Sequence, residues 1–75
     1  MTEVNFKGIG NLVVLEEGEA VTNQFTGVIV DLEPEAVALY DYIKGCEMMA
    51  RYKSLEKGLS AFRKRWPEAY MDLLD

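Results

Sequence analysis

Two residue types that often carry chemistry are nearly missing from this chain of 75 residues, which has no histidine and one cysteine, Cys46. The absence of histidine removes the most common metal ligand and the usual general base near neutral pH. A lone cysteine allows neither an internal disulfide nor a cysteine-rich zinc site, and its place in a helical pattern predicts a buried, structural thiol. We therefore expect no catalytic residue, no metal, no cofactor and no enzymatic activity.

Long apolar runs are missing as well. Hydrophobic residues make up 49% of the chain, but they occur only in short runs, so we expect no segment that crosses a membrane. The first residues, MTEVNFKG, lack the basic and apolar regions of a signal peptide, and a single unpaired thiol suits a reducing compartment. These features predict a cytoplasmic protein without a membrane partner.

Recognised ligand motifs are also lacking. The segment Gly8–Gly10 has neither the third glycine nor the strand-to-helix context of a dinucleotide-binding loop. The three carboxylates in Glu16–Glu19 do not have the alternating oxygen spacing of a calcium-binding EF-hand loop. We expect the first segment to mark a bulge or bend in a strand and the second to be a solvated turn.

The small size of the chain limits its core. Residues 1–75 predict one domain, for which size scaling gives a folded surface of about 4,700 Å². With no disulfide or metal to reinforce so small a core, we expect a partner or a second copy to contribute stability.

What is present begins with a β-rich segment. Residues 1–32 combine β-branched residues with glycines and predict a two-stranded antiparallel hairpin, with its turn at Glu16–Glu19 and a positive φ at Gly18. The second arm, about Ala20–Asp31, has apolar residues on both faces. An isolated two-stranded hairpin is marginal in water, and its free edge can accept a strand from another molecule.

Residues 33–75 predict helices packed on this hairpin. Pro34 fits the first helical position with Glu33 as its cap, and we expect this helix to continue through Gly45 to Ala50. A link over 51–53 precedes a second helix, whose predicted apolar stripe consists of Leu55, Leu59, Phe62 and Trp66.

Ser54 is the expected cap of the second helix, and Pro67 ends it and begins a short last helix. Tyr70, Leu73 and Leu74 of that last helix should return to the core. The predicted fold class is therefore α+β, a hairpin followed by two to three helices.

Charge is unevenly distributed. The net charge is −5, but residues 44–65 hold seven bases and two acids, which gives +5, whereas the remaining residues hold one base and eleven acids, which gives −10. A basic helix face can contact phosphates or an acidic protein. The structural alternative is an ordinary solvated face whose bases favour the helix dipole.

Tyrosines next to these bases have the composition of an interface, and we expect Tyr42 and Tyr52 to be exposed. The candidate interaction surface comprises Tyr42, Arg51, Tyr52, Lys53, Lys57, Arg63 and Lys64.

Two stretches resemble small proteins encoded by phages and prophages of Gram-positive bacteria: ALYDYIKG at residues 38–45 and RWPEAYMDLLD at residues 65–75. The resemblance implies a small accessory or early phage protein that acts by binding a host partner. It assigns no site residues.

Together, these features predict a non-enzymatic protein that binds a protein partner or itself, as a homo-oligomer. A nucleic-acid binder using residues 44–65 is the second hypothesis. The third is an acidic mimic of nucleic acid, which requires the eleven acids to form one contiguous surface.

Overall fold

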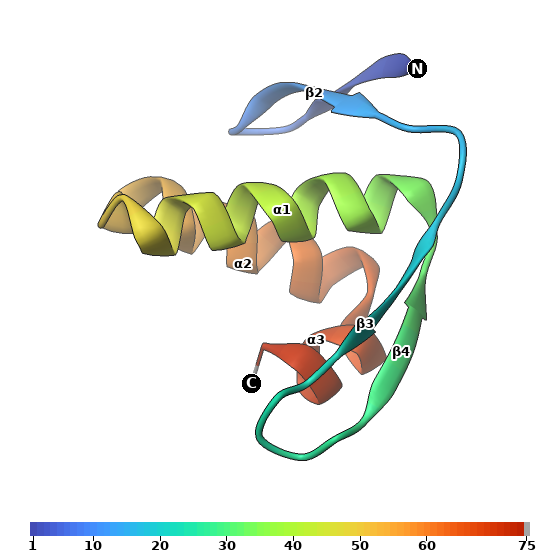
Figure 1. Ribbon diagram of the computed structural model, residues 1–75. Helices are drawn as coiled ribbons and strands as arrows, with labels where there is room; N and C mark the ends of the chain where they lie inside the picture. Colours follow the sequence, from blue (N-terminus) through green and yellow to red (C-terminus); the bar gives the residue numbers. More distant parts are fainter. Residues whose placement is uncertain (75) are drawn as a thin grey trace.

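The computed structural model describes residues 1–74 and shows two hairpins followed by three helices (Figure 1). The elements are β1 (Thr2–Phe6), β2 (Gly10–Val14), β3 (Glu19–Thr22), β4 (Ile29–Leu32), α1 (Pro34–Met48), α2 (Tyr52–Arg65) and α3 (Pro67–Leu73). The α+β class and the N-terminal antiparallel hairpin are confirmed. Asp75, the last residue of the predicted domain and of the phage-like stretch, lies outside the described residues.

The single hairpin predicted over residues 1–32 is wrong, because the chain reverses twice. β1 pairs with β2 and β3 pairs with β4, both antiparallel. The first turn is tight: the Ile9 amide donates to the carbonyl of Phe6 at 2.9 Å, and Gly8 and Gly10 have φ values of 81° and 114°. Gly8 therefore lies in a turn between strands and Gly10 is the first residue of β2, in place of the predicted bulge or bend within one strand; both glycines have a positive φ that other residues avoid.

The segment Glu16–Glu19 is consequently a linker between the hairpins. Gly18 does not adopt the predicted positive φ. A Cβ atom at this position would instead overlap the carbonyl oxygen of Leu32. Gly18 is needed because the backbone entering α1 passes directly against it.

The core lies around α1, which Figure 1 shows between the β1–β2 hairpin on one side and α2 and α3 on the other. Leu39 and Ile43 of α1 and Phe62 of α2 are fully buried. Phe6 and Leu32 cover the core from the two hairpins. Burial of this helix from two sides explains why apolar residues recur around much of its surface.

The predicted start of α1 is confirmed, with Glu33 as N-cap and Pro34 in the first turn. The helix continues through Gly45, as predicted, and ends at Met48. α2 starts two residues before the predicted cap, Ser54. The chain reverses at Ala50, whose φ is +55°, and the Arg51 carbonyl then accepts the Leu55 amide at 2.9 Å, so Arg51 is the N-cap.

The end of α2 and the whole of α3 follow the prediction closely. Phe62 packs between Tyr40 and Trp66 with its ring tilted against both, at centroid distances of 6.5 and 5.3 Å. Pro67 starts α3, which buries Leu73 and packs Tyr70 against the core. Cys46 is buried, as its spacing predicts. Within residues 1–74, no helix has both the length and the apolar character that crossing a membrane would need.

A basic groove between the first hairpin and α2

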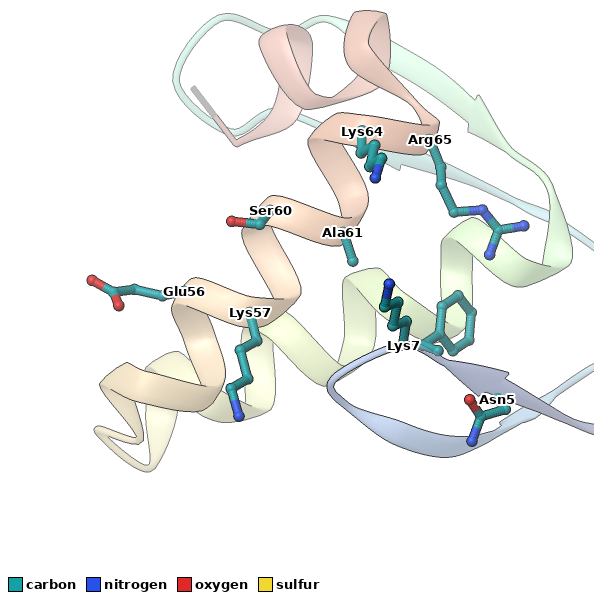
Figure 2. A pocket seen from close by; sticks show the side chains of 9 residues that line it. Asn5, Lys7, Glu56, Lys57, Ser60, Ala61, Lys64 and Arg65 are labelled. Atoms are coloured by element: carbon teal, nitrogen blue, oxygen red, sulfur yellow. The ribbon is translucent and has the colours of Figure 1, made fainter.

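A groove of about 600 Å³ runs between the turn of the β1–β2 hairpin and α2 (Figure 2). Three lysines line it: Lys7 from the hairpin turn, and Lys57 and Lys64 from α2. The other lining residues are Asn5, Phe6, Glu56, Ser60, Ala61 and Arg65.

The helical repeat places the α2 residues on one face. Lys57, Ala61 and Lys64 stand at i, i+4 and i+7, so their side chains follow one stripe along the helix. Lys7 joins them only because Phe6, which is 3% exposed, inserts into the core and fixes the end of β1. The side-chain amide of Asn5, which also lines the groove, donates to Asn11 Oδ1 on the paired strand at 2.9 Å. This hydrogen bond links the two strands of the hairpin beside the groove.

The groove is strongly cationic. Its lining contains four bases and one acid, a formal charge of +3. None of the three lysines is paired with a carboxylate of residues 1–74, and Glu56 extends away from the hairpin in Figure 2. Like charges held on facing walls without counter-charges repel one another, and an anion placed between them relieves that repulsion.

Arg65 has a different role from the lysines. Its guanidinium pairs with Glu35 at 2.5 Å and lies 4.7 Å from the Trp66 ring centroid and 5.4 Å from that of Phe6. The Trp66 indole in turn donates to Glu33 at 3.0 Å. Arg65 therefore ties α2 to α1 and to the hairpin.

The structure separates the seven residues predicted as one interaction surface. Only Lys57 and Lys64 lie in the groove. Arg63 stacks over Tyr70 at 5.9 Å, on another side of α2.

The remaining members of that set lie near the α1–α2 turn, where Tyr42 and Arg51 line a separate depression. Tyr42 is half-buried, its ring close to Gly58, which corrects its predicted exposure. Tyr52, as predicted, is 69% exposed, and Lys53 is exposed beside it.

Lys7 was not predicted as part of a site, because it lies far from the other bases in sequence. One feature of the sequence could have drawn attention to Lys7: it is the only base outside residues 44–65. Its place in the groove depends on how the first hairpin packs on α1, which charge counting does not reveal.

The acidic linker forms a second charged region. Glu16, Glu17 and Glu19 border a shallow hollow next to Leu15 and Val37, and the Glu16 side chain is 89% exposed. Among the residues that the structure describes, no group of three histidine, cysteine, aspartate or glutamate side chains could hold a metal ion.

No protein-family model, curated protein or solved structure matches this chain.

Proposed function

We propose that this chain is a non-enzymatic protein-binding protein that holds an acidic segment of its partner in the basic groove. The observation that carries the proposal is a set of three lysines, Lys7 on the hairpin wall of the groove and Lys57 and Lys64 on the α2 wall, none paired with a carboxylate of residues 1–74. The resemblance to phage proteins suggests a host protein as the partner.

An acidic peptide fits this groove better than a nucleic acid does. Binding of single strands usually relies on exposed aromatic rings on which bases stack, whereas Phe6, the one aromatic residue of the lining, is 3% exposed. The residues outside 44–65 carry −10, and they would repel a long polyanion that extends past the groove. A short acidic segment avoids that repulsion.

The acidic-mimic hypothesis has less support, because the acids do not all face solvent as one group. Of the eleven acids outside residues 44–65, Glu35 pairs with Arg65 and Glu33 accepts a hydrogen bond from the Trp66 indole.

The large exposed surface also supports binding. The accessible surface is 5375 Å², compared with the roughly 4,700 Å² expected for a compact chain of this mass. Part of the excess comes from apolar side chains of the hairpins and their linkers: Val13, Leu15, Phe25, Val28 and Ile29 are 41–99% exposed. A partner that covers such residues stabilises the folded chain.

Fluorescence anisotropy of a labelled peptide made of glutamates and leucines tests the proposal. We expect binding that weakens as salt rises from about 50 to about 300 mM. Lys57→Ala with Lys64→Ala should weaken it about tenfold, because two exposed ion pairs of about 0.7 kcal/mol each sum to about 1.4 kcal/mol. Lys53→Ala, which removes one positive charge outside the groove, is the control and should bind normally.

Single-stranded and duplex DNA form the competing arm of the experiment. Tighter binding of DNA than of the peptide, lost in the groove variant, would favour the nucleic-acid hypothesis. Equal weakening by the groove variant and the Lys53→Ala control would contradict both uses of the groove.

A further inference from the structure

The linker between the two hairpins has the chemistry of a groove ligand. Leu15–Glu19 contains three carboxylates, and residues 15–18 lie outside the strands. The Leu15 side chain is 56% exposed. The Glu16 side chain is 89% exposed, and its carboxylate lies 3.9 Å from the N-terminal ammonium. Acidic and apolar side chains are therefore displayed together on one short segment.

The charges of the linker and the groove are opposite in sign. Glu16, Glu17 and Glu19 carry −3, and the groove lining carries +2 once Arg65, which is paired with Glu35, is left out. The apolar side chain of Leu15 also has a counterpart, since the half-buried Ala61 lines the groove.

The two regions cannot meet within one chain. The groove lies at the turn end of the β1–β2 hairpin, because Lys7 belongs to that turn. The linker leaves the opposite end of the same hairpin, after Val14 (Figure 1). Strands of five residues separate the two ends by roughly 16 Å.

We infer, resting on the proposed function, that the groove binds the Leu15–Glu19 linker of a second copy of this chain. Each copy has one groove and one linker, so two copies that exchange linkers form a closed, two-fold symmetric dimer. The exchange brings the unpaired lysines and the exposed carboxylates together and covers Leu15. The partly exposed Val13 on the adjoining strand would lie at the edge of this contact.

Light scattering combined with size-exclusion chromatography tests the inference on the full chain. At low salt we expect a mass of twice 8.5 kDa, and dissociation as salt approaches about 0.5 M. A wild-type chain that stays monomeric at low salt and high concentration would overturn the inference.

A charge exchange gives the sharper test. Glu17→Lys and Lys64→Glu should each be monomeric, because each places like charges in both contacts of its own dimer. A mixture of the two variants should form a heterodimer, since each linker then meets a groove of opposite charge. A mixture that remains monomeric, although both variants keep the wild-type circular dichroism spectrum, would contradict the inference.

The same variants separate this inference from the proposed function. Glu17→Lys retains its groove and should still bind the acidic peptide, whereas Lys64→Glu should not. Peptide binding by a wild-type chain that never dimerises would overturn the inference and leave the proposed function standing. If Lys64→Glu loses peptide binding but remains dimeric, the inference is overturned and the proposed function stands, because the dimer then uses another surface. If the monomeric Glu17→Lys variant, whose groove is intact, does not bind the peptide, the proposed function is overturned.

Discussion

Two helical glycines respond in opposite directions to the same substitution. Gly58 lies where α2 crosses α1: a Cβ atom there would be 2.8 Å from Ile43 Cγ1 and 3.3 Å from the Tyr42 ring. Gly45, in α1, has nothing within 4 Å of the corresponding position. Each Gly→Ala change gains up to about 1 kcal/mol of helix propensity, so the packing decides the difference between them.

At Gly58 the added methyl group cannot be accommodated freely, because Ile43 is fully buried and cannot move outward. Overpacking of this kind costs about 1–3 kcal/mol, which outweighs the propensity gain. Gly58→Ala should therefore lower the free energy of unfolding by about 1 kcal/mol. Gly45→Ala should raise it by up to about 1 kcal/mol.

Urea unfolding followed by Trp66 fluorescence and by circular dichroism measures both values. In thermal unfolding, each 1 kcal/mol should shift the melting temperature by roughly 4–8 °C for a domain of this size. If both substitutions stabilise the chain equally, α2 does not pack as closely against α1 at Gly58 as described. The position of α2 relative to α1 would then be wrong.

Three further predictions follow from burial. Phe62→Ala removes a fully buried ring and should cost about 3–5 kcal/mol; a cooperative unfolding transition unchanged by this variant would contradict the placement of the core. Phe25→Ser changes a residue that is 99% exposed, so the free energy of unfolding measured in urea should stay within about 0.5 kcal/mol of the wild-type value. A larger loss would mean that another part of the protein covers this ring. Cys46 is 5% exposed, so its thiol should react with a thiol reagent at an appreciable rate only in denaturant; rapid labelling of the native chain would show that α1 opens there.

The sequence predicted the helical part well because its signals are local. Pro34 and Pro67 each lack an amide hydrogen and constrain the residue before them, which sets where α1 and α3 begin whatever surrounds them. Continuation through Gly45 also depends on local terms, since nothing packs against that position.

The strands were harder to predict because two turns competed. Both Gly8 and Gly18 are flanked by residues suited to strands. Only the first adopts a positive φ; the second is a glycine because the Leu32 carbonyl lies against it. Such a close approach depends on tertiary structure, so local pattern did not distinguish the two roles.

Only the α2 side of the groove could be predicted, because the hairpin side depends on tertiary packing. The spacing of Lys57 and Lys64 on one helix placed them together. Lys7 joins them through the packing of a hairpin whose turn had been predicted elsewhere.

The central claim, that the basic groove binds an acidic segment, is tested most directly by titrating the ¹⁵N-labelled chain with the acidic peptide and following amide NMR shifts. We predict that the shifts concentrate on Lys7, Lys57, Ala61 and Lys64, and on the Trp66 indole next to Arg65. Shifts centred on the Phe25 loop or the α1–α2 turn, or no shifts at low salt, would contradict it.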